Sequence, residues 1–403
     1  MCLWRKLMKS NPKLFYILLP VITFCCLILT IYCAFNTITG SNSKKPQKTK
    51  SDNVVSHTSS PSATPKVTQT PEPAAPAPQT PANSDTASGE TTLTISAAGD
   101  CTLGSDKNSP SSVNFYSVYK KEQNDAYFFQ NVKKYFKNDD LTLVNLEGTL
   151  STSTTRMDKT YAFNGSPDYV NILKAGSIEA VSFANNHCRD YGAASYDETI
   201  ENLKKADISY ASFDKVCIYK VKDKKIGMVA VNGLLGLDYS KQLISSGIKK
   251  LKKKHADLIL VSIHAGIEHT NVINAVQTQL THYAVDLGAD LVLGHHPHTL
   301  QGIEKYKGVY IVYSLANFCF GGNTNPVDKD TIIFQQTFTF QDNNKKADDN
   351  IRIIPCRVSS TSTINNYQPT PVKGSARSKI INRMNALCKP FHLTFAKNGR
   401  LVY

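Results

Sequence analysis

The sequence has no acidic residue in its first 50 positions, and it contains neither a nucleic-acid-binding motif nor an internal repeat. Residues 1–50 contain eight Lys or Arg and no Asp or Glu, whereas residues 51–90 contain one Lys and four acids. The whole chain carries a formal charge of +14 over 403 residues. No nucleic-acid motif accompanies this charge, which favours a solvated basic surface over nucleic-acid binding. There is no internal repeat, so repeat architectures are excluded.

Cysteine is scarce in the part of the chain that follows residue 35. Six cysteines in about 310 residues are too few for a disulfide-rich scaffold. An even number outside the cell permits bridges, but the sequence does not assign them. They are Cys101, Cys188, Cys217, Cys319, Cys356 and Cys388.

Charge is absent from Phe15 to Phe35, a run of 21 residues that reads FYILLPVITFCCLILTIYCAF. This run is long enough to cross ~30 Å of hydrocarbon as a helix. The run is longer than the apolar core of a signal peptide, and no small-x-small cleavage site follows it. Cys33 does not fit a lipoprotein signal, because Tyr32 before it is too large for a lipobox. We expect a basic cytoplasmic tail (1–14), a transmembrane signal anchor (15–35) and a single-pass cell-membrane protein whose main domain is extracellular.

Large apolar residues are nearly missing from residues 36–90, which are rich in Pro, Ala, Ser and Thr. Such a segment cannot offset its ordering entropy and is predicted to be a disordered linker. A folded domain is expected over 91–403. Its apolar runs predict strands beginning at Thr91 and over 141–148, 179–187, 257–266, 289–296, 308–318 and 331–340, a hairpin over 216–233 with its turn near Asp223 and Lys224, and helices over 113–137, 166–176, 195–207, 240–255 and 271–287.

The alternation of strands and helices predicts an α/β layered fold, and the later strand-rich part predicts a second sheet. Five of the predicted strands end in a residue that can bind a metal. In an open α/β sheet, ligands bind at the carboxyl ends of the strands, so these five ends are predicted to form one rim. The ends are AAGD (Asp100), VNLE (Glu147), SFANNH (Asn185, Asn186, His187), VSIHAGIEH (His264, Glu268, His269) and VLGHHPH (His295, His296, His298).

Each of these segments has a structural explanation when it is taken alone. A single His after a strand is more often a hydrogen-bonded structural residue, Gly99-Asp100 fits a turn, and Asn185-Asn186 fits another. The five coincidences together favour a metal or catalytic rim. Carboxylate, amide and imidazole ligands suit Mn, Fe, Zn or Mg without selecting among them. Two such divalent ions would activate water and bind a substrate oxygen.

The segments GDCTLG, NLEGTL, ANNHCRDYG, VSIHAGIEH, GHHPHTLQGIE and YSLANFCFGG together resemble the CapA family of poly-γ-glutamate capsule synthesis proteins. That family is related to the calcineurin-like metallophosphoesterases, and the resemblance spans about Thr91 to Gly322. It implies a four-layer α/β/β/α sandwich. It also implies a cell-surface role in making, exporting or anchoring an anionic glutamate polymer, beside membrane-bound capsule synthase subunits.

The resemblance also implies a role for each residue of the rim. His187 corresponds to the proton-donating histidine, and Asp190 is placed to orient it. Supporting or substrate-facing roles fall to Asn185, Glu268, His269, His295 and Asn317. The implied metal ligands are Asp100, Glu147, Asn186, His264, His296 and His298.

The chain departs from the phosphoesterase pattern at several points. The first motif reads Asp100-Cys101-Thr102 where Asp-x-His is usual, which removes one ligand. Glu147 replaces an Asp, and Ala265 stands where an aromatic residue is expected. Cys101 and Cys188 adjoin predicted ligands, where they pack, form a disulfide or favour Zn; packing or a disulfide is the preferred interpretation.

Three functions remain compatible with the sequence. The first is a metal-dependent hydrolase or transferase acting in poly-γ-glutamate metabolism. The second is a non-catalytic subunit that binds or exports the polymer, which the loss of a ligand at Thr102 favours. The third is a phosphodiesterase acting on a wall polymer, which rests on fold analogy alone.

Overall fold

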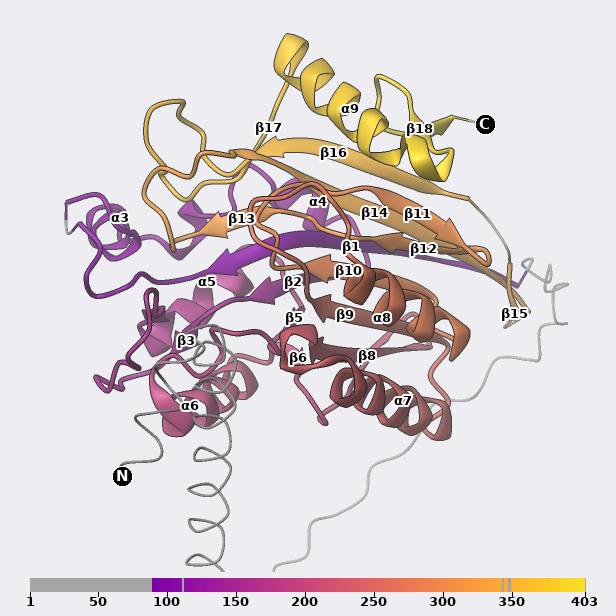
Figure 1. Cartoon of the computed structure of the whole chain (residues 1–403), viewed down its shortest axis with the longest axis horizontal. Helices are drawn as coiled ribbons and strands as arrows, with labels where there is room; N and C mark the ends of the chain where they lie inside the picture. The colour runs from indigo at the N-terminus through magenta and orange to yellow at the C-terminus, as the bar shows by residue number, and fades with distance from the viewer. Residues whose placement is uncertain (1–88, 111, 343, 347–348, 403) are drawn as a thin grey trace, which may run out of the picture. The chain divides into compact units, whose positions relative to one another are not determined.

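The computed structural model describes residues 89–402 with the exception of 111, 343, 347 and 348. The predicted cytoplasmic tail, the anchor at 15–35 and nearly all of the predicted linker lie outside these residues. Among the described residues, no helix is both long and apolar enough to span a membrane. The described part forms a mixed α/β fold built on two large sheets, as the sequence predicts (Figure 1).

The larger sheet has nine strands in the order β17-β16-β14-β1-β2-β5-β6, with β13 beside β1 and β15 beside β14. Four strands run parallel to β1, namely β13, β2, β5 and β6. Strand β14 is antiparallel to β1 and pairs with it from Glu90 to Ala97. The strands are β1 (Glu90–Thr102), β2 (Leu141–Leu146), β5 (Ala180–Ser182), β6 (Ser209–Ala211), β13 (Asn317–Phe320), β14 (Asp330–Gln341), β15 (Asn344–Lys345), β16 (Ile351–Arg357) and β17 (Thr370–Pro371).

The second sheet has six strands in the order β11-β12-β10-β9-β8-β7. Its four central strands are parallel, and the edge strands β11 and β7 are antiparallel to their neighbours. The strands are β7 (Cys217–Val221), β8 (Lys224–Asn232), β9 (Leu258–His264), β10 (Leu291–His295), β11 (Ile303–Tyr306) and β12 (Val309–Val312). The predicted hairpin is β7–β8, and its turn lies at Lys222 and Asp223, whose φ angles are 48° and 61°.

The apolar faces of the two sheets pack against each other, with Leu93 and Leu143 of the first sheet in one core with Leu260 and Leu293 of the second. The outer face of the first sheet is covered by α3 (Phe115–Glu122), α4 (Lys133–Phe136), α5 (Val170–Ala175) and α6 (Gly192–Lys205). The outer face of the second sheet is covered by α7 (Leu237–Lys253) and α8 (Ala275–Asp286). Helix α9 (Gly374–Cys388) lies next to β16 (Figure 1). It contributes Ile380 and Met384 to the core between the sheets.

Short elements complete the described residues. The strands β3 (Thr149–Leu150) and β4 (Asn164–Gly165) pair with each other, as do β18 (Thr394–Phe395) and β19 (Leu401–Val402). Single 3-10 turns occur at η1 (Asp125–Tyr127), η2 (Pro167–Tyr169), η3 (Gly233–Leu235) and η4 (Lys389–Phe391).

Three sequence predictions about the fold were wrong in part. The single helix expected over 113–137 divides into α3, η1 and α4, because Gln123 adopts a left-handed φ of 46° and Asn124 caps the next turn. The strand expected over 308–318 divides into β12 and β13, which belong to different sheets. The second sheet comes mainly from the middle of the chain, because β14 and β16 extend the first sheet beside β1 through pairing that no local pattern encodes.

Candidate metal-binding site

The registers of the two sheets bring the predicted strand ends together. At the end of β1, Asp100 lies opposite Asn145 of β2 and Asn317 of β13. In the second sheet, His264 at the end of β9 lies opposite His295 of β10. Side chains that follow these ends contact one another across the two sheets, since His264 Nε2 lies 2.7 Å from Asn186 Oδ1 and His298 Nδ1 lies 3.3 Å from Asp100 Oδ2. The structure thus brings predicted strand ends of both sheets together.

Glu147 occupies the centre of this rim, where histidines surround it without donating a hydrogen bond to it. Its side chain is fully buried, and neither carboxylate oxygen makes a hydrogen bond. Its Oε1 lies 3.8 Å from Nε2 of His187, 3.9 Å from Nε2 of His264 and 3.8 Å from Nε2 of His298. Burial raises the pKa of Glu147 well above its ordinary value. Ligands that share one ion at about 2.1 Å stand about 3–4 Å apart, so these spacings suit a cation.

Asp100 is the second buried carboxylate of the site. Its Oδ1 accepts a hydrogen bond from Asn145 Nδ2 (2.9 Å) and lies 3.2 Å from His295 Nδ1, and its Oδ2 lies 3.3 Å from His298 Nδ1. Burial opposes ionisation, but the two imidazoles outweigh it and hold the pKa of Asp100 well below its ordinary value. Burial also disfavours a charged His298, yet Glu147 and Asp100 raise its pKa to about 9. The two carboxylates therefore create a strong demand for positive charge.

The GHHPH loop supplies two of the predicted ligands. His296 and His298 both have positive φ angles, of 98° and 55°. Two groups of ligand atoms, Asp100–Glu147–His298 and Glu268–His296–His298, each have their members within 4.8 Å of one another and share His298. Burial lowers the pKa of His296 to about 4, with a further contribution from His298. His296 is therefore neutral at pH 7, and a neutral imidazole is the form that binds a metal.

His264 and Asn186 face each other across the site. The Oδ1 atom of Asn186 lies 2.7 Å from Nε2 of His264. On the other side of the ring, Asn145 Nδ2 lies 3.4 Å from His264 Nδ1. Burial lowers the pKa of His264 well below its ordinary value, so this ring too is neutral.

His187 is held by a carboxylate and a lysine. Its Nδ1 lies 2.6 Å from Oδ2 of Asp190, and Oδ1 of Asp190 forms an ion pair of 2.7 Å with Lys159. The Asp190 carboxylate also accepts the backbone N–H of Phe163 (2.6 Å). Burial lowers the pKa of His187, although Asp190 counteracts this. The neutral ring donates its Nδ1 proton to Asp190 and leaves Nε2 as an acceptor that faces Glu147.

The remaining predicted residues fall into two groups. Asn185 donates to Leu146 O (2.8 Å) and Asn145 Oδ1 (3.1 Å) and accepts the N–H of His187 (3.0 Å), so it holds the loop together. His295 is buried behind Asp100 and does not line the cleft.

Three predicted residues do line the open side of the site. Glu268 and His269 lie on the loop after β9, and Asn317 accepts from His298 Nδ1 (2.8 Å). They border a cleft of about 480 Å³, at whose base His187 and His298 lie. The aromatic rings of Phe163 and Phe320 also line it.

Sequence reasoning missed several residues of the site. Asn145 contacts Asp100, Asn185 and His264, and its signal was a single polar residue within the otherwise apolar run LTLVNL. Lys159 and Arg383 carried no local signal. Arg383, on α9, also lines the cleft, where it pairs with Asp328 at 2.6 Å.

Both cysteines that adjoin the site are free thiols. Cys101 and Cys188 are buried in the core beneath the helices of the first sheet. Burial raises the pKa of both thiols, to about 11 for Cys188. Of the alternatives left open by the sequence, packing agrees with this arrangement. Thr102, which replaces the usual histidine, is buried, and its hydroxyl has no hydrogen-bond partner.

Comparisons with known proteins identify the family of this chain. The sequence model of the bacterial capsule synthesis protein family PGA_cap matches residues 94–322. The chain is 30% identical over 258 residues to the capsule biosynthesis protein CapA of Bacillus anthracis, covering 57% of this chain and 60% of that protein. It is 31% identical over 213 residues to the PGA biosynthesis protein CapA of Bacillus subtilis, covering 48% of this chain and 56% of that one.

The matched region thus spans less than two thirds of either relative. Among solved structures, a hypothetical protein from Thermus thermophilus aligns over 65% of this chain with 14% identity and a TM-score of 0.41, a likeness too weak to support an inference. The family match covers more than half of the chain and contains every strand end that builds the rim. This protein belongs to the PGA_cap family of bacterial capsule synthesis proteins, the CapA family.

Proposed function

We propose that this protein acts in the biosynthesis, export or anchoring of poly-γ-glutamate at the cell surface, through a metal site of hydrolase type in a metallophosphoesterase-like four-layer sandwich. The observation that carries the proposal is the buried Glu147 carboxylate. It lies within 3.9 Å of three imidazoles and has no hydrogen bond of its own. Burying a carboxyl group that receives no hydrogen bond is costly, and a bound cation would offset that cost.

The residues at the site fit divalent metal ions. Two carboxylates, one amide oxygen and neutral imidazoles form a mixed set that suits Mn, Fe, Zn or Mg. Bound ions would supply Lewis-acid polarisation of a substrate carbonyl or phosphoryl oxygen and would activate water. The shared position of His298 in both ligand groups favours two neighbouring ions. The residues that would hold them are Asp100, Glu147, Asn186, His264, His296 and His298, and Glu268 is a further candidate because it belongs to the second ligand group.

His187 and Asp190 would move the proton. Because Asp190 fixes the Nδ1 proton of His187, Nε2 is free to accept a proton on the cleft side. The resulting imidazolium is stabilised by Asp190 and then donates the proton to the leaving group. His187, which the sequence predicts to be the proton donor, would therefore accept a proton first and donate it afterwards.

We infer the location of the protein from the sequence of its first 90 residues. The charge-free segment 15–35 behind a basic flank supports an anchor in the cell membrane, and 36–90 would extend the domain from its surface. The names of the relatives, which refer to capsule and PGA biosynthesis, support an anionic glutamate polymer as the ligand. Membrane-bound synthase subunits would be the partners.

Elemental analysis tests the metal site directly. The full-length chain and its Asp100→Ala, His296→Ala double variant would be purified after growth with added Mn, Fe and Zn. We expect about two equivalents of metal in the wild type and loss of both in the variant. Folded wild-type protein that contains no metal under these conditions would refute the proposed site.

A second function is favoured by Thr102 alone. Its unpaired, buried hydroxyl leaves the place of a usual histidine ligand unfilled. A subunit that binds or exports the polymer without chemistry would tolerate this loss. It predicts that polymer binding survives His296→Ala, and abolition of a polymer-cleaving activity by that change would exclude it.

A further inference from the structure

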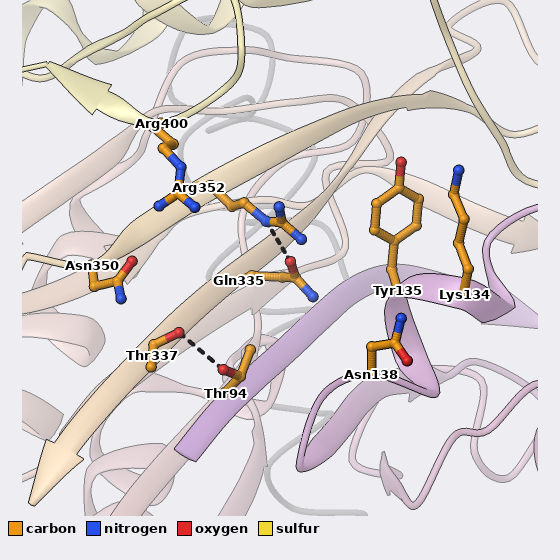
Figure 2. A pocket seen from close by; sticks show the side chains of 9 residues that line it. All are labelled: Thr94, Lys134, Tyr135, Asn138, Gln335, Thr337, Asn350, Arg352 and Arg400. Carbon is orange, nitrogen blue, oxygen red and sulfur yellow. Dashed lines mark hydrogen bonds between the residues drawn. The ribbon is translucent and has the colours of Figure 1, made fainter. Parts of the chain in front are cut away.

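A second cavity lies on the outer face of the larger sheet, away from the metal-binding cleft. It encloses about 390 Å³ and is lined by residues of β1, α4, β14, β16 and the segment before β19 (Figure 2). Thr94 on its floor precedes Asp100 by six residues on the same strand. At about 3.3 Å per residue the two positions lie roughly 20 Å apart.

Strand alternation explains why this floor is polar. Leu93 and Ile95 point into the core between the sheets, so Thr94 points outward, and Phe334 and Phe338 alternate in the same way with Gln335 and Thr337. The hydroxyls of Thr94 and Thr337 lie 2.9 Å apart (Figure 2). Helix α4 has only four residues and ends at Phe136, which leaves this part of the sheet open.

The cavity is strongly basic. Lys134, Arg352 and Arg400 line it, and no acidic residue does. Within the described residues, no carboxylate oxygen lies within the 4 Å ion-pair distance of these three cations. A cavity with three such cations and no carboxylate attracts anions.

Arg352 is the best-fixed of the three cations. Its Nε donates to Gln335 Oε1 (2.6 Å), and Gln335 Nε2 donates in turn to Ser96 Oγ (2.8 Å). Figure 2 shows the guanidinium of Arg352 between Arg400 and Tyr135, and its terminal nitrogens make no hydrogen bond to a described residue. Burial, and then the nearby charge of Arg400, lower the pKa of Arg352. An anion would relieve this repulsion.

Three of the six neutral residues that line the cavity carry side-chain amides. Asn138, Gln335 and Asn350 surround the cations, and the ring of Tyr135 lies 5.1 Å from Lys134 Nζ and 6.0 Å from Arg352 Cζ. A guanidinium matches a carboxylate in a two-pronged arrangement, and side-chain amides match the donors and acceptors of amide linkages. The combination suits a polymer that carries carboxylates on an amide-linked chain better than a phosphate polymer.

We propose that this cavity, formed around Lys134, Arg352 and Arg400, is a binding site for carboxylates of a polyglutamate chain and is separate from the metal-binding cleft. The proposal rests on the proposed function, since it takes the same polymer as its ligand. A site roughly 20 Å from the cleft would hold the chain while another segment of it occupies the cleft.

The test measures binding of fluorescein-labelled poly-γ-glutamate to the full-length chain by fluorescence anisotropy at low salt. The main test variant is the double substitution Arg352→Gln, Arg400→Gln. The single variant Arg400→Gln is tested as well, because Arg400 is exposed and its replacement leaves the packed Arg352 intact. The matched control is Lys249→Gln, Lys253→Gln, which removes the same charge from exposed positions of α7. Thermal unfolding establishes that each variant is folded.

We expect the double arginine variant to raise Kd at least about tenfold and Arg400→Gln to raise it severalfold, with less than about a twofold change in the lysine control. Equal weakening by the arginine and lysine variants would overturn the proposal, since it would indicate general attraction. Binding lost in His296→Ala but kept in the arginine variants would overturn it and leave the proposed function standing.

Two further outcomes separate the possible failures. Absence of any polymer binding by the folded wild type would refute the proposed function together with this site. Polyphosphate that binds in an Arg352-dependent way, while poly-γ-glutamate does not, would overturn the choice of ligand.

Discussion

Glu147→Gln tests the central physical claim, that a buried carboxylate in this site requires a cation. The change keeps the shape of the side chain and removes its charge. In the metal-free protein, burial of the Glu147 carboxyl group without a hydrogen bond raises its pKa and so lowers the free energy of unfolding at pH 7. His298 compensates only in part, because its Nε2 lies 3.8 Å from Oε1, beyond hydrogen-bond distance. The metal-free variant should therefore be more stable than metal-free wild type, by about 1–3 kcal/mol.

The response to metal should change in the opposite direction. A metal supplied at about 100 times its Kd stabilises the folded wild type by about 2.7 kcal/mol. For a folded domain of about 310 residues, that raises Tm by roughly 4 °C. Glu147→Gln removes the carboxylate at the centre of the site, so its Tm should hardly respond to Mn or Zn.

The assay is thermal unfolding of the full-length chain, with chelator and with added Mn or Zn, at pH 7. The matched control is Glu179→Gln, a half-buried carboxylate whose Oε2 accepts the N–H of Thr142 (2.8 Å) on the same sheet. The control should keep the full metal response. A metal-free Glu147→Gln variant that is less stable than wild type, or one that keeps the metal-induced rise in Tm, would refute the reasoning.

Three further predictions concern the neighbours of this carboxylate. Asp190→Asn should lower the pKa of His187 further, because Asp190 is the group that raises it; an NMR titration that finds no downward shift would contradict this. With chelator present, the free energy of unfolding should fall by on the order of 3 kcal/mol from His296 alone as the pH drops from 6.5 to about 4, because the unfolded state binds the proton first. Urea unfolding should show a shallower pH dependence in His296→Gln than in the wild type. Identical curves would count against this assignment. Gly294→Ala places a methyl 2.0 Å from the carbonyl oxygen of Tyr313, so it should lower the free energy of unfolding by about 1–3 kcal/mol and weaken metal binding. The methyl of Gly308→Ala meets no atom within 4 Å, so this control should leave metal binding unchanged. An equal loss of metal in both variants would exclude a local cause.

The strand ends were predictable because their signal is local. Apolar runs such as LVLGHH and LILVSIH specify strands through burial, and the polar residues that follow mark the carboxyl ends of those strands. Position relative to a strand end is a property of the sequence, so Asp100, Glu147, His264 and His296 could be selected without coordinates. The free cysteines were not predictable, since pairing depends on distance in space.

The second sheet was assigned to the wrong part of the chain for a related reason. The run TIIFQQTFTF has strand character wherever it pairs, and only the tertiary structure places β14 beside β1. In the same way, GVYIVYSLANF reads as one strand, but it crosses from the second sheet to the first between β12 and β13. That crossing carries Asn317 to the position opposite Asp100.

The sequence by itself determined the α/β class, the strand-end residues of the rim and the charge-free segment that predicts an anchor, because burial periodicity and residue type are local properties. Only the tertiary structure decided that Glu147 is left without a hydrogen bond among three imidazoles, that Asn145 links Asp100 to His264, and that Lys134, Arg352 and Arg400 surround one cavity. These arrangements depend on the registers of strands and on contacts between residues far apart in the chain. Such pairings are fixed by the packing of the whole domain, which no single segment encodes.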